Sequence, residues 1–201
     1  MDNIDDINWE EIYTGLRGRL IIKFMNLYHK GLHRLITEEI SCRKNSTILD
    51  IGCGGGGLIK FLSMKTSGKV TGIDYSANMV NAAIKKNAKG IKKGQISIIR
   101  ASVSELPFDK NSFDTITAFE TIHFWPSIPD DLIEIKRVLK PGGSLHIMNK
   151  VPDEKSKWYD FVKFKNPDEC RDTLSTAGYV NIEISTKLKK SWMYATGIKP
   201  S

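Results

Sequence analysis

The chain has 201 residues, of which 40% are hydrophobic, and this is typical of one globular domain that needs no disulfide bridges for stability. Its three cysteines are too few and too scattered for a disulfide framework or a zinc cluster. No stretch without charged residues is long enough to span a membrane, and the acidic start (residues 1–6) lacks the features of a secretory signal. The sequence therefore predicts a soluble, cytoplasmic protein.

The net charge of +7 comes mainly from lysine, which supplies 23 of the 30 basic residues. Proteins that read nucleic acids depend on the bidentate fork of arginine, whereas lysine often only solvates a surface. The densest basic run contains no aromatic residue that could stack on a base, and it comprises Lys85, Lys86, Lys89, Lys92 and Lys93. This run favours a solvated helix face and argues against a nucleic-acid partner.

Residues 1–44 form a lead-in whose hydrophobic residues recur at helical spacing between Trp9 and Ile40. Gly15 and Gly18 interrupt this pattern, which predicts two helices. We expect the lead-in to act as a helical lid and residues 45–201 to form a single folded unit.

From residue 45 onward, short apolar runs alternate with amphipathic segments. The predicted strands are 47–51, 69–74, 95–100, 113–119, 144–149, 180–185 and 192–197. The predicted helices are 57–65, 76–87, 130–139 and one that begins at Asn166 and ends at Gly178. Such alternation predicts an α/β fold, with a Rossmann-like, mostly parallel sheet of seven strands and helices on both faces. The last two strands are too close in sequence for a crossover helix, so they should form an antiparallel hairpin at the sheet edge.

The glycine-rich segment 50–57 that follows the first strand is the most informative part of the sequence. A turn of this kind needs glycine because it is tight and because a ligand must approach its backbone closely. Asp74 ends the second strand twenty residues after Gly54, where a carboxylate can accept two hydrogen bonds from a ribose. The two features together predict a site for an adenosine-containing cofactor beyond the carboxyl ends of the strands.

Two classes of cofactor fit this glycine pattern. Gly52, Gly54 and Gly57 match the G-x-G-x-x-G pattern of dinucleotide-binding enzymes, and the segment from Asp50 to Gly56 equally matches D-x-G-x-G-x-G. A carboxylate at Asp50 would repel a pyrophosphate but attract the ammonium group of S-adenosylmethionine. The charge favours S-adenosylmethionine as the cofactor. An NAD(P)-dependent oxidoreductase is the alternative.

Further motifs follow in order along the chain. They are Val70-Thr71-Gly72-Ile73-Asp74-Tyr75-Ser76 with Met79, Glu105-Leu106-Pro107-Phe108, Ser112-Phe113-Asp114, Ile122-His123-Phe124, Arg137-Val138-Leu139-Lys140-Pro141-Gly142-Gly143, Ala177-Gly178-Tyr179 and Gly197-Ile198-Lys199-Pro200. With these motifs, residues 45–200 resemble the class I S-adenosylmethionine-dependent methyltransferases. The chain is most similar to their small-molecule branch, typified by the ubiquinone/menaquinone-biosynthesis enzymes. The resemblance implies methyl transfer to a small-molecule acceptor by in-line displacement.

The resemblance also assigns residues to the methionine part of the cofactor. Asp50 and the backbone of Gly52 and Gly54 would face it, and Gly56 would allow close approach. Phe119, at the end of the fourth predicted strand, would lie beside it.

The ribose and adenine would be bound by a second group of residues. The resemblance implies that Asp74 binds the ribose hydroxyls and that Tyr75 and Met79 flank the adenine. Ser102 occupies the position where many family members have an acidic residue. The hydroxyl of Ser102, or the backbone of Val103, would then contact the adenine amino group.

Catalytic residues are difficult to identify because the donor is already activated, and orientation alone can supply roughly 7–11 kcal/mol of barrier reduction. A general base is needed only when the acceptor must lose a proton. His123, just after the fourth predicted strand, is the candidate, although it could instead cap a loop or pack under Trp125. Glu120 could bind the acceptor or the donor's ammonium group. Asp114 is expected to fix the start of a strand.

The acceptor pocket is expected to come from segments without motifs. His29 and His33 lie four residues apart, and no third ligand is evident, so lining this pocket is favoured over binding a metal, and a plain core or surface position is favoured over both. Other aromatic residues that could line the pocket or belong to the core are Trp9, Tyr13, Tyr28, Trp158, Tyr159, Phe161 and Phe164. A non-catalytic module that binds the cofactor is the alternative to an enzyme.

Overall fold

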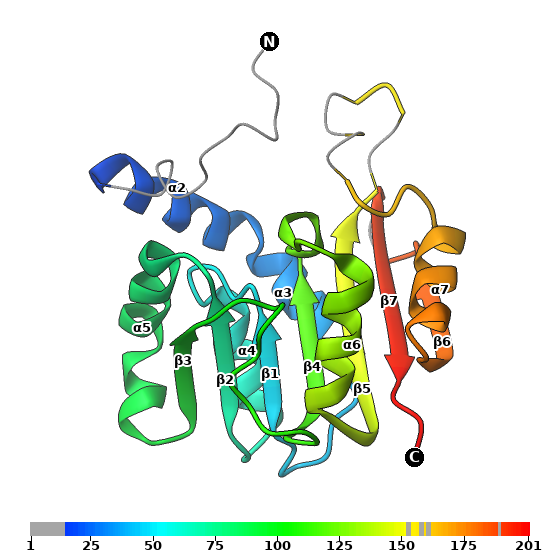
Figure 1. Cartoon of the computed structure of the whole chain (residues 1–201). Coiled ribbons are helices and arrows are strands. Elements are labelled where there is room, and N and C mark those ends of the chain that lie inside the picture. Colours follow the sequence, from blue (N-terminus) through cyan, green and yellow to red (C-terminus); the bar gives the residue numbers. More distant parts are fainter. Residues whose placement is uncertain (1–14, 152–153, 157–158, 160–161, 189) are drawn as a thin grey trace.

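A twisted sheet runs through the middle of the molecule, as Figure 1 shows in the computed structural model, which describes residues 15–151, 154–156, 159, 162–188 and 190–201. Within these residues the sheet has seven strands in the order β3-β2-β1-β4-β5-β7-β6. The strands are β1 Ile48–Ile51, β2 Val70–Asp74, β3 Ile96–Arg100, β4 Phe113–Phe119, β5 Leu139–Lys150, β6 Val180–Ser185 and β7 Trp192–Ile198. β7 is antiparallel to both of its neighbours, and the pairs from β3 to β5 are parallel.

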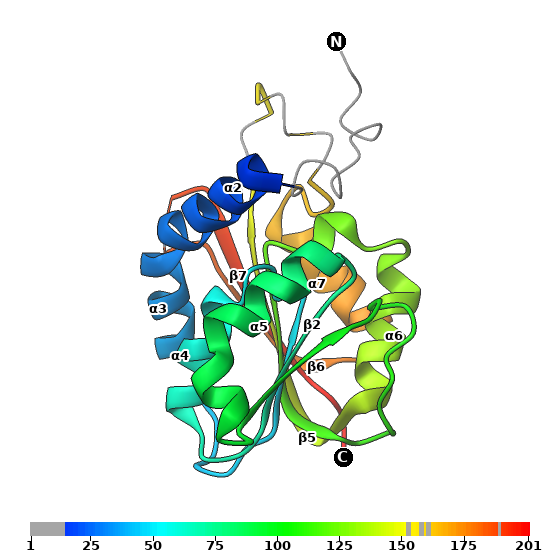
Figure 2. The ribbon, with the colours of Figure 1, turned by 90° about the vertical axis from the view of Figure 1, so that its left-hand side faces the viewer.

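Helices cover both faces of this sheet (Figure 2). On one face lie α3 (Lys30–Glu39), α4 (Gly57–Lys65) and α5 (Ala77–Lys92), and on the other lie α6 (Ile128–Val138) and α7 (Pro167–Thr176). Along each strand, successive side chains point to opposite faces of the sheet, so they pack alternately against the two groups of helices. Ile48 packs on the α3 side and Leu49 on the α6 side.

The helix α2 (Gly15–Tyr28) lies at the end of the molecule where the parallel strands finish (Figures 1 and 2). Among the helices of the described ranges, none is both long and apolar enough to cross a bilayer.

The predicted fold class is confirmed, including the mostly parallel sheet of seven strands and the hairpin of β6 and β7 at its edge. Two predicted boundaries were wrong. The helix α5 continues to Lys92 rather than ending at Asn87, although Asn87 itself leaves helical geometry (φ −105°, ψ 15°). Its side chain donates to the carbonyl oxygens of Gly56 and Ala83, both at 3.0 Å, which accounts for a local kink within a continuing helix.

The strand β5 begins at Leu139, before the turn that was expected to precede it. Leu139 pairs with Phe113 and Ser144 pairs with Thr115, so the intervening Pro-Gly-Gly residues form an irregularity inside the strand. A β-bulge of this kind adds residues to one strand without ending its pairing.

The lead-in divides at a different place from the one that the glycines predicted. Gly15 does begin α2, with φ +60°, but Gly18 lies buried inside that helix, and α2 and α3 separate at His29. The ring of His29 packs edge-on against Phe119 (ring centroids 5.3 Å apart) and Trp192 (6.3 Å). Tertiary packing therefore sets this bend. The part of the lead-in that contains Trp9 and Tyr13 lies outside the described residues, and the division at residue 44 stays a prediction.

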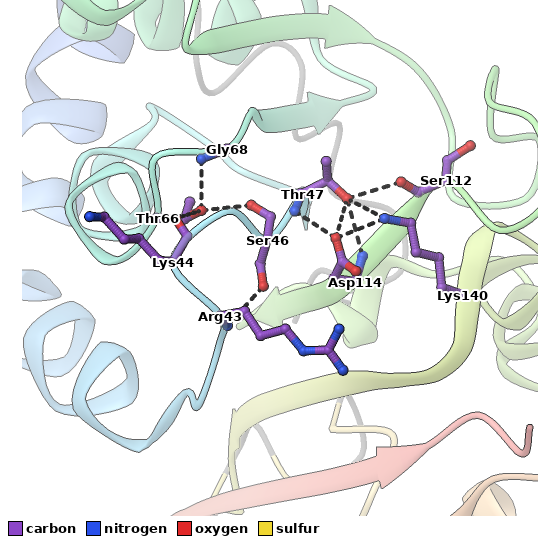
Figure 3. Close-up of polar contacts among 9 residues, drawn as sticks. All are labelled: Arg43, Lys44, Ser46, Thr47, Thr66, Gly68, Ser112, Asp114 and Lys140. Atoms are coloured by element: carbon purple, nitrogen blue, oxygen red, sulfur yellow. Dashed lines mark hydrogen bonds and ion pairs between the residues drawn. The ribbon is translucent and has the colours of Figure 1, made fainter.

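A polar network fixes the amino-terminal ends of β1 and β4 (Figure 3). The backbone N and the Oγ1 of Thr47 both donate to Oδ2 of Asp114, at 2.8 and 2.7 Å, and Nζ of Lys140 donates to the same oxygen at 2.9 Å. Burial alone would raise the pKa of Asp114, but the hydrogen bonds from Lys140 and Thr47 outweigh burial and hold this pKa below its usual value. The expectation that Asp114 fixes the start of a strand is confirmed.

We expect Asp114→Ala to lower the free energy of unfolding by about 1–3 kcal/mol, because it leaves the donors of Thr47 and Lys140 without their shared acceptor. Urea denaturation at pH 7 would measure this. Asp114→Asn keeps one oxygen acceptor and should cost less. Since the folded-state pKa lies below the unfolded one, the contribution of the carboxylate should be lost only as pH falls through that lower value. An Asp114→Ala variant as stable as the wild type would contradict this account.

Candidate functional site

A cavity of about 640 Å³ opens at the carboxyl ends of β1, β2 and β4. β1 lies between β2 and β4 in the sheet, so this is the point where the order of strands reverses and where open α/β sheets bind their ligands. Its wall combines the glycine-rich turn, the end of β2 and the start of α5, residues 101–103, residues 119–121 and residues 124–126 with Ile22 of α2, His29 between α2 and α3, and His33 of α3.

The turn from β1 into α4 forms the floor of the cavity. Gly52 and Gly54 have left-handed backbones, with φ +65° and φ +52°. A Cβ on Gly52 would lie only 1.9 Å from Oγ1 of Thr121, whereas a Cβ on Gly54 would meet nothing within 4 Å. Gly54 therefore faces open space on the ligand side. Gly56 does not line the cavity, because a Cβ there would point at Asn87 of α5, 2.4 Å from Nδ2.

Asp74 joins this turn to the end of β2. One carboxylate oxygen accepts from the backbone N of Gly54 (2.9 Å) and the other from the backbone N of Ser76 (3.0 Å). Burial raises the pKa of Asp74, although the two backbone hydrogen bonds oppose the rise. A carboxylate can accept about four hydrogen bonds, so one on the cavity wall retains acceptor capacity for a ligand.

An unsatisfied hydroxyl lies next to Asp74. Oγ of Ser76 is buried and has no hydrogen-bond partner among the described residues, yet Ser76 lines the cavity. Nε1 of Trp125 is in the same situation. Buried polar groups usually have partners, so these two groups indicate that a polar ligand completes the site. Together with the open space at Gly54, they fit an adenosine-containing cofactor.

Asp50 lies behind this wall and not on it. It is 2% exposed, and Oδ1 accepts from Oγ1 of Thr117 at 2.6 Å. Burial raises the pKa of Asp50 to about 7, the hydrogen bond from Thr117 opposes the rise, and the nearby charge of Asp74 adds to it. Two buried carboxylates at the end of adjacent strands create a site with a preference for positive charge.

The residues predicted to surround the adenine all line the cavity. Met79 is buried, whereas Tyr75 is exposed on its outer side. Oγ of Ser102 accepts from the backbone N of Ser104 at 3.2 Å. The predicted Val103 and Phe119 are also part of the wall.

Aromatic side chains form the wall near α3. The ring of Phe119 contacts His33 edge-on (ring centroids 4.9 Å apart) and stacks on Trp192 (5.8 Å). Burial, with smaller contributions from the charges of His29 and Lys86, lowers the pKa of His33 to about 3. His33 is therefore neutral at physiological pH, and this end of the cavity is apolar.

Glu120 and not the predicted His123 lies on the cavity wall. Glu120 has a left-handed backbone (φ +53°), and its Oε1 accepts from the backbone N of Lys150 at 2.6 Å. Nε2 of His123 approaches the same oxygen at 3.9 Å from behind. Strained non-glycine residues of this kind cluster at functional sites.

Several residues that line the cavity were not predicted as site residues from the sequence, among them Ile22, Ser76, Thr121 and Trp125. Ser76 and Thr121 each lie two residues after the end of a strand, and this position near the carboxyl end was a usable signal. Phe164 belongs to the core between the sheet and α7 and not to the pocket. Trp158 and Phe161 lie outside the described ranges.

Comparison with known proteins identifies the class of this site. Residues 49–147 match the family model described as a methyltransferase domain. The chain is 34% identical to a 2-phytyl-1,4-naphtoquinone methyltransferase of Nostoc punctiforme over 59% of this chain and 54% of that protein. It is 35% identical to a demethylmenaquinone methyltransferase of Staphylococcus aureus over 57% of this chain and 47% of that protein. The chain thus spans about half the length of these relatives.

Solved structures agree on the fold. A chain from a complex between the Trm112 methyltransferase activator and a methyltransferase of Haloferax volcanii superposes with a TM-score of 0.79, at 20% identity, over 96% of this chain and 98% of that chain. The glycine-rich turn, the acidic end of β2, the sheet order and the family match lead to one conclusion. Residues 49–147 form a methyltransferase domain, and the chain shares its fold with solved S-adenosylmethionine-dependent methyltransferases.

Proposed function

We propose that the protein transfers a methyl group from S-adenosylmethionine to a neutral, apolar small molecule that carries a quinone-type ring. The observation that carries this proposal is one cavity with two different ends, a polar end at Gly54 and Asp74 and an aromatic end at His33 and Phe119. The names of the relatives, which are quinone methyltransferases, support the ring-bearing acceptor.

At the polar end, Asp74 would accept hydrogen bonds from the ribose hydroxyls with the lone pairs that Gly54 and Ser76 do not use. Tyr75 and Met79 would flank the adenine. Ser102 and the backbone of Val103 would contact its amino group.

Asp50 would act through its charge from behind the wall. The methionine part of the cofactor carries an ammonium group, which a carboxylate near the end of β1 would attract across the backbone of Gly52. With the cavity empty, Asp50 is partly protonated at neutral pH because its pKa is about 7. Binding of a cation would favour the ionised form and release a proton.

At the aromatic end, the neutral imidazole of His33 and the ring of Phe119 would hold a flat, uncharged acceptor. When bound, S-adenosylmethionine supplies a methyl group activated by its positively charged sulfur. The task of the protein is then mainly to orient the acceptor and to exclude water. We assign the second task to α2 and α3 as a lid, and the removal of an acceptor proton, where one is needed, to Glu120 together with His123.

The location follows from the cysteines. Cys42, Cys53 and Cys170 are all free thiols, and burial raises the pKa of Cys53 well above its usual value. Unpaired thiols favour a reducing compartment, and we propose the cytoplasm.

Isothermal titration calorimetry with S-adenosylmethionine, S-adenosylhomocysteine and NAD(H) tests the proposal directly. We expect micromolar binding of the two sulfur compounds and no heat from NAD(H), because Asp50 disfavours a pyrophosphate. Binding of NAD(H) alone would refute the proposed function. The absence of binding by all three would point to a domain that has lost its donor site.

Gly54→Ala should weaken S-adenosylmethionine binding by tenfold or more while leaving the protein folded. The added methyl group meets no protein atom, so it occupies ligand space, and its overlap with a ligand should cost about 1–3 kcal/mol. Gly94→Ala is the matched control, since Gly94 also has a left-handed backbone (φ +74°) with nothing near its Cβ position, yet it lies outside the cavity. Both variants should lose similar stability, about 1 kcal/mol. Equal donor affinity in the two variants would exclude Gly54 from the site.

The affinity for S-adenosylmethionine should rise several-fold between pH 6 and pH 7.5 and then level off. The sign follows from Asp50, whose pKa is about 7: raising the pH ionises it, and the ionised form attracts the ammonium group. Calorimetry at pH 6.5 in buffers of different ionisation heat should detect net proton release. Asp50→Asn should bind more weakly, with no proton release and no such rise. The same pH dependence in Asp50→Asn and wild type would disprove this role.

A further inference from the structure

The positive charge of the chain is concentrated in the segments that form one side of the molecule. Residues 15–37, 51–68 and 75–104 contain thirteen of the 30 basic residues and none of the 23 acidic ones. These segments supply the helices α2, α4 and α5, and α5 contacts both of the other two. Arg34 is paired with Glu38 within the neighbouring helix α3 (3.0 Å), but the three segments supply no carboxylate to the lysines of α2, α4 and α5, so this surface favours an anionic partner.

A groove of about 1250 Å³ runs between these three helices. Its lining includes Lys23 of α2, Lys60 of α4 and Lys85 of α5, together with the apolar side chains of Phe61 and Met64. Burial, and after it the charge of Lys60, lowers the pKa of the neighbouring Lys86, as expected for cations that lie close together without compensation.

An exposed apolar stripe lies beside this groove. Leu20, Phe24, Leu27 and Tyr28 follow the spacing of one helix face, and between 55% and 68% of each residue is exposed. Met64 on α4 is 67% exposed. Contiguous apolar residues of this size are rare on the surface of a monomer and mark an interaction site.

Apolar side chains next to lysines distinguish between anionic partners. A nucleic acid would use the lysines but gains little from exposed leucines. A bilayer with anionic lipids uses both, because the apolar face enters the acyl boundary while the basic side chains contact the headgroups. The combination of stripe and groove therefore fits a lipid surface.

We propose that the face formed by α2, α4 and α5 docks on membranes that contain anionic lipids. Leu20, Phe24 and Leu27 enter the acyl boundary, and the lysines of the groove contact the headgroups. Ile22 and His33 line both the groove and the cavity, so the docked face borders the acceptor end of the site. The inference rests on the proposed function for its purpose, delivery of an apolar acceptor from the bilayer.

Vesicle sedimentation with the full chain tests the docking. Vesicles of phosphatidylcholine alone are compared with vesicles that contain 30% phosphatidylglycerol, at low and at high salt. We expect at least fivefold more protein to sediment with the anionic vesicles at low salt, and most of this difference to disappear at high salt because ions screen the lysines. No preference for the anionic vesicles would overturn the proposal.

Two charge-reversal variants test whether vesicle binding depends on the lysines of this face or only on the net charge of the protein. Lys23→Glu/Lys60→Glu/Lys85→Glu should lower the vesicle affinity at least tenfold. Its matched control, Lys44→Glu/Lys69→Glu/Lys110→Glu, makes the same change of net charge with exposed lysines that precede β1, β2 and β4, at the amino-terminal ends of these strands and away from the cavity. The control should bind vesicles nearly as well as the wild type. Equal losses in the two variants would overturn the proposal.

A third variant and two further readouts complete the experiment. Phe24→Ser/Leu27→Ser should also reduce vesicle binding, because it removes apolar side chains that enter the acyl boundary. A purely electrostatic contact would not be affected by this change. A duplex RNA probe that binds more tightly than the vesicles, and that the three groove substitutions alone release, would identify a nucleic-acid surface and refute the lipid. Calorimetry with S-adenosylmethionine on the same proteins keeps the two proposals apart: a wild type that binds vesicles but not the donor refutes the proposed function only.

Discussion

The hydrogen bonds that Asp74 accepts from the backbone of Gly54 and Ser76 organise the whole functional end of the molecule. They connect the turn after β1 to the end of β2 and to the start of α5. Asp74 is only 7% exposed, so these two hydrogen bonds lie in surroundings of low dielectric constant, where the loss of a hydrogen-bond partner is costly. The ligand-binding backbone is therefore set before any ligand arrives, which is the condition for catalysis by positioning.

The two ends of the cavity are built from different kinds of groups. The donor end is built from backbone groups and carboxylates at strand ends, and the geometry of an open α/β sheet places these groups. The apolar end depends on side chains from α2, α3 and the short segment after β4, whose identities the sheet does not restrict. A fold of this type can keep its donor and change its acceptor, so the acceptor must be argued from the site and not from the fold.

What the sequence could predict follows from the same division. Gly54 and Asp74 were recognisable because a tight turn and the proposed ribose site demand those residue types. The bend at His29 was not, because it depends on Phe119 and Trp192, which are far away in the sequence. The sequence around Glu120 gives no local signal for its left-handed backbone, because Glu120 is not a glycine. With this backbone conformation, Glu120 and not His123 lies on the cavity wall.

Gly52 and Thr121 share one volume, since a Cβ on the glycine would lie 1.9 Å from the threonine hydroxyl. We therefore expect substitutions at the two positions to be epistatic, although the positions lie 69 apart in the chain. A larger side chain at 52 requires both a smaller one at 121 and relief of the left-handed backbone, and a bulkier residue at 121 is opposed by the turn itself. Directed evolution of the cavity that varies position 121 alone will therefore sample only side chains of threonine size or smaller, and wider changes require the two sites to be randomised together.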